Sequence, residues 1–351
     1  MKVVGIDRES ASVISIRLTG TDGDSTTPPL PGQFLTLRLR PTAKSAPLLR
    51  SYSLSGAPDP TQYRISVKLE PEGAASGFLH TRLRPGDILQ VGAPRGTFVL
   101  HDGQHPVVLI SAGVGATPVL AMLHALAAAR SDREVWWLHG ARNEREHAFR
   151  DESARLLSSL ANAHRLVCYS NPDPGDKPGN DFDRAARLDA SALDDAGVPL
   201  DAEFYVCGPA GFMHDIGAAL ASREVSPDRV RTEIFGPAAS MTLGVVEDGA
   251  RKQPHPPEDK PGSGPLVSFA RSNLAVAWNP EFGTLLEFTE ACDVPVRWSC
   301  RTGVCHTCET GLVSGPVAYT PDPLEAPAPG YALICCARPQ DDAVVLDLYT
   351  G

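Results

Sequence analysis

The sequence lacks several features that would place it in common classes of protein. No uncharged apolar run approaches the ~20 residues that a membrane helix needs, which excludes a helical membrane protein. The first residues lack the apolar core of a secretory signal peptide, so we expect a cytoplasmic protein. Lysine is missing from residues 265–351, and 32 Lys and Arg against 42 Asp and Glu leave a formal charge of −10. This balance argues against a nucleic-acid partner.

The 351 residues are enough for two or three domains, and they include eight cysteines. In a cytoplasmic protein, eight cysteines are more often metal ligands or buried thiols than a disulfide framework. Residues 1–100 carry a net charge of +4, residues 101–264 carry −8, and residues 265–351 carry −6. The basic first region suits an anionic cofactor and the acidic last region suits a protein partner, although a charge excess is commonly only a solvated face.

The pattern of apolar residues changes along the chain and predicts several domains. Residues 1–102 read as short strands between Pro, Gly and Asp turns, typical of an antiparallel barrel, at 13–18, 34–39, 63–69 and 88–91. Residues 103–237 alternate strands with helices, which favours a parallel sheet with helices on both faces. Residues 238–264 read as a Pro- and Gly-rich linker, and residues 265–351 begin with a hairpin and a helix.

Cysteine spacing gives the strongest chemical signal. Cys300, Cys305 and Cys308 form C-x₄-C-x₂-C, and a fourth cysteine follows in the pair Cys335–Cys336. This is the spacing of plant-type [2Fe–2S] ferredoxins, in which four thiolates converge on one small cluster. A zinc site is the nearest alternative, but its usual pair of CxxC units is absent. Thiols buried by chance are the other alternative.

The residues after the thiol pair resemble the end of the ferredoxin domain in oxygenase reductases. Aligning on the terminal VLDL makes Cys335 the fourth ligand. Neighbours on an extended strand face opposite sides, so we expect Cys336 to point away. His306 departs from the small residue usual in such loops, and it either bonds near the cluster or faces solvent.

The segment Arg50-Ser51-Tyr52-Ser53 resembles the flavin motif RxYS of the ferredoxin reductase family. A guanidinium can clamp a phosphate, Tyr52 can lie against the flavin ring, and Ser53 can bond near its reacting nitrogen. The resemblance also implies flavin contacts from Phe34, Gly73, Ala75 and Ser76. A barrel strand could carry the tetrapeptide by accident.

Three further motifs stand at strand ends and suit a dinucleotide. A glycine turn between a strand and a helix would place backbone N–H groups at phosphate, and it consists of Gly113, Val114, Gly115, Ala116, Thr117 and Pro118. It is not the Rossmann GxGxxG, because Pro118 occupies the third glycine position. The other two motifs are Cys207-Gly208-Pro209 and Glu233-Ile234-Phe235-Gly236-Pro237. Arg142, after another strand, could touch the 2′-phosphate of NADP.

Taken together, residues from about 10 to 237 resemble the flavin reductase portion of flavohaemoglobin. The resemblance implies a flavin-binding barrel (1–102), an NAD(P) domain (103–237), a linker (238–264) and a β-grasp ferredoxin domain (265–351). The IFGP and GAAS segments favour FAD over FMN, although Phe34 stands where this branch has Tyr. The whole chain also resembles the reductase part of proteins that fuse a MOSC domain to a flavin reductase and a ferredoxin.

The resemblance implies an oxidoreductase that takes hydride from NADH or NADPH to FAD and passes single electrons through a [2Fe–2S] cluster. Ser53, Cys207 and Glu233 would position the hydride transfer. The expected acceptor is a Rieske-type oxygenase, a cytochrome P450 or a MOSC-type protein, and the expected state is a monomer. A redox sensor or carrier without turnover and a free-flavin reductase are the alternatives. We interpret Cys168 and Cys292 as packed thiols, and His139 and His147 as structural or exposed.

Overall fold

A computed structural model describes residues 1–21, 27–42, 48–234, 240–242, 253–257, 262–298, 301, 303–304, 306–340 and 342–348. The chain divides into two compact units, Met1–Phe235 and Gly236–Gly351. Across these described ranges, the helices are all too short or too polar to traverse a bilayer.

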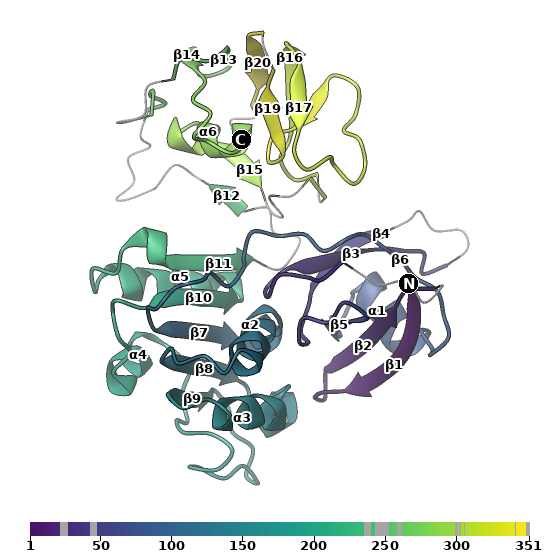
Figure 1. Ribbon diagram of the computed structural model, residues 1–351, viewed down its shortest axis with the longest axis vertical. Coiled ribbons are helices and arrows are strands. Elements are labelled where there is room, and N and C mark those ends of the chain that lie inside the picture. The colour runs from purple at the N-terminus through teal and green to yellow at the C-terminus, as the bar shows by residue number, and fades with distance from the viewer. Residues whose placement is uncertain are drawn as a thin grey trace. The chain divides into compact units, whose positions relative to one another are not determined.

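Two three-stranded antiparallel sheets form the first part of the first unit (Figure 1). One sheet has the order β1 (Lys2–Arg8), β2 (Val13–Thr19), β5 (Gln62–Lys68). The other has the order β4 (Leu48–Ser53), β3 (Phe34–Leu39), β6 (Gln90–Val91). Single bridges, Lys2–Ile88 and Leu54–Ile65, join the two sheets, so the predicted barrel is closed by isolated pairs rather than by a continuous ladder.

The core of this part is apolar, with Ile16, Leu35 and Ile65 fully buried in it. Helix α1 (Ala74–Thr81) packs Leu79 into the same core. The apolar pattern of the sequence did not predict this helix. Its eight residues include Gly77 and Thr81, both poor helix formers, so burial rather than intrinsic propensity stabilises it.

A five-stranded parallel sheet forms the second part of the first unit. Its order is β11 (Val230–Ile234), β10 (Glu203–Gly208), β7 (Val107–Ala112), β8 (Val135–Ala141), β9 (Ala163–Tyr169). One face packs against α2 (Ala116–Ala128) and α3 (Arg150–Ser158), and the other against α4 (Ala190–Ala196) and α5 (Ala210–Ala221). Short 3₁₀ turns lie at Gly113–Gly115 (η1), Glu144–Glu146 (η2) and Pro227–Arg229 (η3).

The order of the strands indicates at which edge of this sheet a ligand would bind. The chain leaves β7 in one direction to form β8 and β9, and it returns on the other side to form β10 and β11. In open parallel sheets, ligands bind at the carboxyl ends of the strands at such a reversal. Here the reversal lies between β7 and β10.

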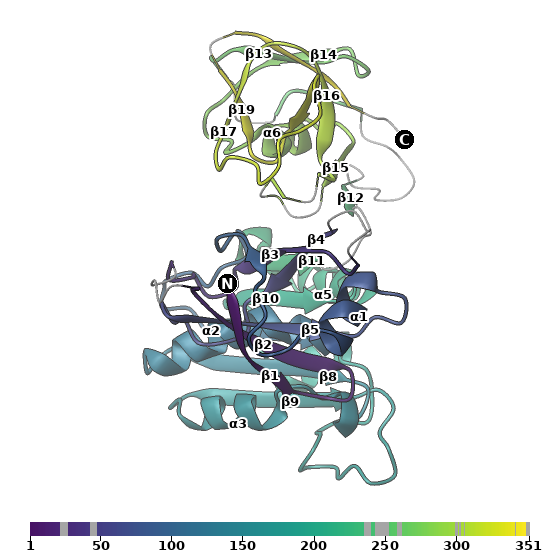
Figure 2. The same ribbon diagram turned by 90° about the vertical axis from the view of Figure 1, so that its right-hand side faces the viewer.

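The second unit contains a mixed five-stranded sheet of order β14 (Leu274–Ala277), β13 (Leu266–Phe269), β20 (Val344–Asp347), β16 (Glu309–Ser314), β18 (Tyr331–Leu333). Figure 2 shows α6 (Leu285–Ala291) beside this sheet, and Leu285 and Phe288 of the helix share the sheet's apolar core. Two-stranded pairs add β12 (Ser240–Thr242) with β15 (Val296–Trp298), and β17 (Val317–Tyr319) with β19 (Ala337–Pro339). The expected antiparallel and parallel parts are confirmed, and the mixed sheet with its helix fits the expected β-grasp domain.

Candidate functional site

The flavin motif lies on β4, paired with β3. Phe34 stands opposite Ser53, and Leu35 stands opposite Tyr52. The Ser53 side chain is buried, and its Oγ has no hydrogen-bond partner within the part of the chain that the structure describes. A buried hydroxyl without a partner costs free energy, so a ligand atom placed beside it would restore the lost bond. This observation fits a bound flavin.

The other residues of the motif differ in exposure. Arg50 is exposed and Tyr52 is half-buried. Burial raises the pKa of Tyr52 to about 12, although the nearby positive charge of Arg50 acts to lower it. The phenol is therefore neutral at physiological pH. Ser51 lies across from Thr36, and their hydroxyl oxygens are 3.2 Å apart. Phe34 is buried, with its ring 3.2 Å from the position of a Cβ on Gly96.

The start of α1 is a second candidate contact for a flavin, because a helix leaves its first N–H groups without intrahelical partners. Gly73 is the N-cap, and the first turn contains no acidic residue. The Ser76 hydroxyl donates to the Gly73 carbonyl at 3.1 Å and accepts from the Glu70 N–H at 3.1 Å. Ser76 thus closes the turn, and an anion would meet the backbone N–H groups of residues such as Ala75.

The glycine turn lies at the strand-order reversal, between β7 and α2. Gly113 has a φ of +55°, and a Cβ there would meet nothing within 4 Å. The Thr117 hydroxyl donates to the Val114 carbonyl at 2.9 Å, and Ala116, Thr117 and Pro118 are buried in the first helical turn. The backbone at Gly113 therefore borders open space at the start of a helix, as contact with a phosphate requires.

Glu233, Cys207 and Ser111 stand side by side in register on β11, β10 and β7. Cys207 is fully buried, and burial raises the pKa of its thiol well above the ordinary value. Burial likewise raises the pKa of Glu233 to about 8. A thiol and a carboxyl that is largely protonated at neutral pH therefore meet at the carboxyl ends of the strands. Neither group is a charged nucleophile in this state.

The motif Cys207-Gly208-Pro209 connects β10 to α5. Gly208 is buried, and a Cβ on it would come within 2.7 Å of the Phe212 ring. Pro209 is exposed and caps the start of α5. The chain thus turns sharply at the end of β10, close to the glycine turn.

His139 and His147 lie together in the interior, and the sequence did not reveal them as a pair. His139 Nδ1 lies 2.9 Å from Ser111 Oγ, and His147 Nδ1 lies 3.0 Å from the Tyr169 hydroxyl. The two imidazole rings stack with centroids 4.9 Å apart. Burial lowers the pKa of His139 to about 4 and that of His147 to about 2, so both are neutral. The sequence left open whether these histidines are structural or exposed, and their burial supports a structural role.

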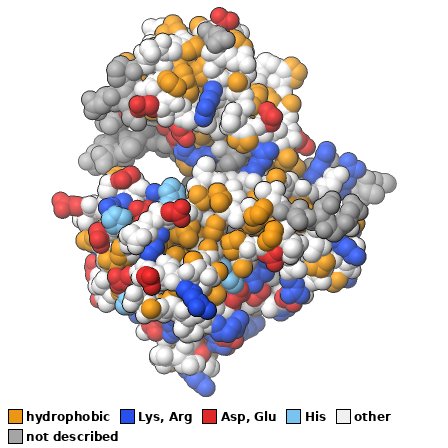
Figure 3. Space-filling model, viewed as in Figure 1, with side chains coloured by type: hydrophobic (Ala, Val, Ile, Leu, Met, Phe, Trp, Pro, Cys, Tyr) orange, Lys and Arg blue, Asp and Glu red, His pale blue; other side chains and the backbone are white. Residues whose placement is uncertain are grey.

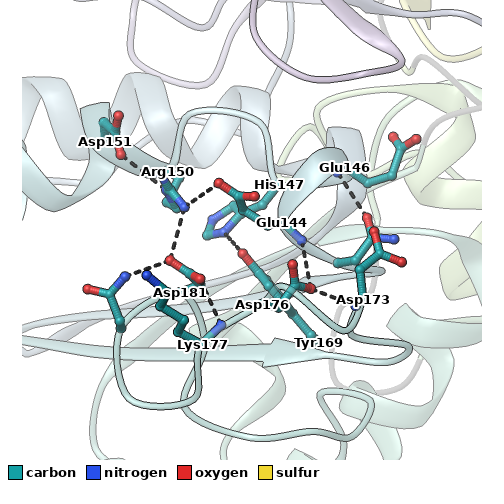
Figure 4. A network of polar contacts seen from close by, with 12 residues as sticks. Glu144, Glu146, His147, Arg150, Asp151, Tyr169, Asp173, Asp176, Lys177 and Asp181 are labelled. Carbon is teal, nitrogen blue, oxygen red and sulfur yellow. Dashed lines mark hydrogen bonds and ion pairs between the residues drawn. The ribbon is translucent and has the colours of Figure 1, made fainter.

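A network of carboxylates lies beside the carboxyl ends of β8 and β9 (Figure 4). Arg150 binds Glu144 at 2.8 Å and Asp181 at 3.1 Å. Asp176 accepts the backbone N–H groups of Glu144 and Asp173, which ties the segment after β9 to η2. Arg142, the residue named for a 2′-phosphate, is exposed directly after β8.

Both thiols after β18 lie in a turn, not on the extended strand that the sequence led us to expect. The Cys336 N–H donates to the Leu333 carbonyl at 3.2 Å and closes this turn. The two thiols still have different partners. Cys335 Sγ accepts a hydrogen bond from the Gly303 N–H at 3.2 Å, whereas Cys336 Sγ donates to the Leu333 carbonyl at 3.4 Å.

Cys308 and Cys335 are both buried, each with 3% of its surface exposed. His306 has a φ of +59°, its Nδ1 is 3.5 Å from a Glu309 oxygen, and its buried Nε2 has no partner among the described residues.

Several residues named from the sequence lie outside the described residues: Cys300, Cys305, Phe235, Gly236 and Pro237. Only the backbone of Ile234 is described. Within the described ranges alone, no three His, Cys, Asp or Glu side chains form a metal-binding group.

The backbone N–H aimed at Cys335 Sγ fits an iron–sulfur cluster. Hydrogen bonds to ligand sulfurs are a usual feature of such sites and tune their potential. Gly303 has a φ of +69°, and a Cβ on it would come within 2.7 Å of Cys336 Sγ. The loop therefore requires glycine for its approach to the two thiols.

Comparisons with known proteins agree with this geometry. Residues 109–217 match the oxidoreductase NAD-binding domain, and residues 273–340 match the 2Fe-2S iron-sulfur cluster binding domain. The flavohemoprotein of Deinococcus radiodurans is 44% identical over 238 residues, which cover 68% of this chain and 59% of that protein. The chain thus spans about three-fifths of the length of such curated relatives.

Solved structures extend the comparison to the whole chain. The FAD/NAD-binding domain of the nitric oxide dioxygenase from Vibrio cholerae is 35% identical, with a TM-score of 0.61, and the match covers 67% of this chain and 98% of that one. Phthalate dioxygenase reductase shares the fold over 99% of this chain and 97% of its own, with 22% identity and a TM-score of 0.56. The chain therefore belongs to the family of flavohaemoprotein-type FAD/NAD-binding reductase modules, and it carries in addition a C-terminal 2Fe–2S ferredoxin domain.

Proposed function

We propose that this protein oxidises NADH or NADPH and delivers single electrons to a partner oxygenase or another redox protein. The observation that carries the proposal is that an FAD/NAD-binding module and a 2Fe–2S domain share one chain. A pyridine nucleotide gives up two electrons together, whereas a [2Fe–2S] cluster accepts one. When bound, FAD supplies the chemistry that joins the two, because it can accept hydride and release electrons one at a time.

The residues of β4 and α1 would hold the flavin. Ser53 would use its unpartnered hydroxyl at the flavin edge, and Tyr52 would lie against the ring as a neutral phenol. The exposed Arg50, with Ser51 on the same strand, would meet phosphate, as would the backbone at Gly73, Ala75 and Ser76. Phe34 is buried against Gly96, so its contribution would be to pack beneath the motif.

The strand ends at the reversal would hold the nucleotide. The glycine turn that ends at Pro118 would bind its phosphates, and Cys207, Gly208 and Pro209 would border the nicotinamide. The largely protonated Glu233 would leave this edge nearly uncharged beside the nicotinamide ring. Ile234, Phe235, Gly236 and Pro237 would complete the flavin edge, and Arg142 would meet a 2′-phosphate if NADPH is the donor.

Cys300, Cys305, Cys308 and Cys335 would be the cluster ligands. The N–H that Gly303 donates to Cys335, and the carbonyl that accepts from Cys336, support Cys335 as the thiolate and Cys336 as a thiol. A thiolate accepts hydrogen bonds and cannot donate one.

The partner is proposed from the relatives and from charge. Two of the solved structures that share the fold over 99% of this chain are phthalate dioxygenase reductase and an intact self-sufficient cytochrome P450 monooxygenase. Both match below 25% identity, so they support an oxygenase partner only as a class. In the second unit, Lys and Arg are few on the face that Figure 3 shows, which suits a basic docking surface on a Rieske-type oxygenase, a cytochrome P450 or a MOSC-type protein. A cytoplasmic monomer is the form we expect.

An anaerobic reductase assay tests this function. NADH or NADPH is expected to bleach the bound flavin and to drive reduction of both ferricyanide and cytochrome c. Cys305→Ser is expected to abolish cytochrome c reduction while ferricyanide reduction continues from the flavin. Failure of both nucleotides to bleach the flavin would instead favour a carrier or sensor, and cytochrome c reduction indifferent to Cys305→Ser would favour a free-flavin reductase.

A further inference from the structure

A charged cluster in the first unit joins the flavin-motif strands to the nucleotide helices. Arg64 of β5 makes a two-pronged ion pair with Glu152 of α3, with Nη1 3.0 Å from Oε2 and Nη2 2.8 Å from Oε1. His124 of α2 lies with its Nε2 2.6 Å from the same Oε1. The three side chains are only 16–19% exposed. Glu152 thus receives three close contacts from two different parts of the unit.

Arg64 connects this cluster to the strand of the flavin motif, and His124 connects it to the helix that follows the glycine turn. Arg64 also donates to Ser55, through Nε to the hydroxyl at 3.3 Å and through Nη2 to the carbonyl. Ser55 follows Ser53 by two residues. At the other end, His124 lies on α2, the helix that begins directly after the glycine turn.

We propose that Glu152 is a positioning residue for hydride transfer: through Arg64 and His124 it fixes the strand of Ser53 relative to the glycine turn. The inference rests on the proposed function, since it assumes that flavin and nucleotide meet between these two elements. Hydride transfer depends steeply on the distance and alignment of donor and acceptor, and a misplacement of about 1 Å can cost about 100-fold in rate. A rigid ion pair holds such a distance better than apolar contacts that can slide.

The geometry distinguishes this cluster from ordinary contact between the two parts. A second set of bonds also crosses between them: the Ser12 hydroxyl donates to Glu146, and the Ala11 N–H donates to the Arg145 carbonyl. That set joins the turn before β2 to η2, and it touches neither the Ser53 strand nor α2. Glu146→Gln is therefore a matched control, because it neutralises a carboxylate that links the same two parts elsewhere.

The test uses the full chain with FAD and cluster bound. Three variants are measured: Glu152→Gln, Arg64→Met and the double variant that combines these two changes. Each is compared with the control, Glu146→Gln. The Gln amide would turn one donor toward Arg64 or His124 and weaken the cluster without changing its size. In stopped-flow measurements we expect the limiting rate of flavin reduction to fall about 10-fold or more in Glu152→Gln. The Kd for the nucleotide, the flavin content and the flavin potential should change less than about 2-fold.

Two readouts separate positioning from general stabilisation. If Arg64 and Glu152 act as one unit, the double variant should be no slower than either single variant. Amide hydrogen exchange in the nucleotide-free protein provides a readout without turnover, and β5 and α3 should exchange faster in Glu152→Gln than in Glu146→Gln.

An unchanged reduction rate in Glu152→Gln, or an equal loss in Glu146→Gln, would overturn this inference while leaving the proposed function intact. If the wild-type flavin were not bleached by either nucleotide, both would fall.

Discussion

Gly115 lies directly against the backbone of Cys207: a Cβ on Gly115 would stand 2.3 Å from the Cys207 carbonyl oxygen. The glycine turn and the strand end of Cys207 are therefore one packed structure, formed where the strand order reverses. This contact is with backbone, so no side-chain rotation can relieve it.

Gly115→Ala is expected to separate the two motifs. We expect a loss of about 2 kcal/mol or more in the free energy of unfolding, together with a weaker Kd for NADH and NADPH. Urea unfolding and nucleotide titration measure the two effects. Gly217→Ala is the control, because a Cβ there meets nothing within 4 Å and alanine favours the helix; it should be neutral or slightly stabilising. Equal stability of the two variants would show that the turn can move away from β10.

Ser53→Ala tests whether the buried hydroxyl serves the flavin or the fold. Because Ser53 Oγ has no partner in the described residues, its removal should leave the thermal stability of the flavin-stripped protein unchanged or raised. In the protein with FAD bound, the rate of flavin reduction should fall about 10-fold, because the loss of one hydrogen bond costs about 1 kcal/mol. Ser15→Ala is the control, because it removes a buried hydroxyl of the neighbouring antiparallel sheet that is bonded to Ser66 at 2.7 Å and has no flavin role. A stripped Ser53→Ala protein that melts well below wild type would contradict the assignment.

The elements and the motif spacings were predictable because they depend on local patterns. The strand at Phe34–Leu39 has the predicted bounds, and those of the other predicted strands differ by a few residues. The glycine turn and Cys207 were each recognisable, but their contact depends on the strand order, which periodicity does not encode. The Arg64–Glu152 pair joins residues 88 apart, and no local pattern points to it.

The thiol pair shows why local rules fail at turns. Alternation on an extended strand predicted opposite faces for Cys335 and Cys336, but the backbone there is a turn closed by the Cys336 N–H. The different partners of the two sulfurs come from that turn. The stacked His139 and His147 were likewise invisible, because they come from β8 and the segment after it and meet only through the fold.

Glu233 gives a pH dependence with a definite sign. Its pKa is raised by burial to about 8, so the folded protein keeps the proton while the unfolded chain loses it from about pH 4.5 upward. The folded state then binds more protons, and this group lowers stability as pH rises from about 4.5 to 8. Relative to wild type, the free energy of unfolding of Glu233→Gln should rise by about 4 kcal/mol between pH 5 and pH 8.5 in urea unfolding. A stability difference that does not vary with pH would show that Glu233 is ionised in the folded protein.

The two thiols of the turn give the sharpest test of the cluster. Cys335→Ser should remove the visible absorbance of the cluster and cytochrome c reduction, because the Gly303 N–H would then face a hydroxyl that does not ligate iron as a thiolate does. Cys336→Ser should keep both, since a serine hydroxyl can donate to the Leu333 carbonyl in place of the thiol. Ferricyanide reduction should continue in both variants. Iron and sulfide content, measured anaerobically, checks the result. Loss of the cluster in Cys336→Ser with retention in Cys335→Ser would reverse the assignment, and zinc in the wild-type protein would overturn the electron relay.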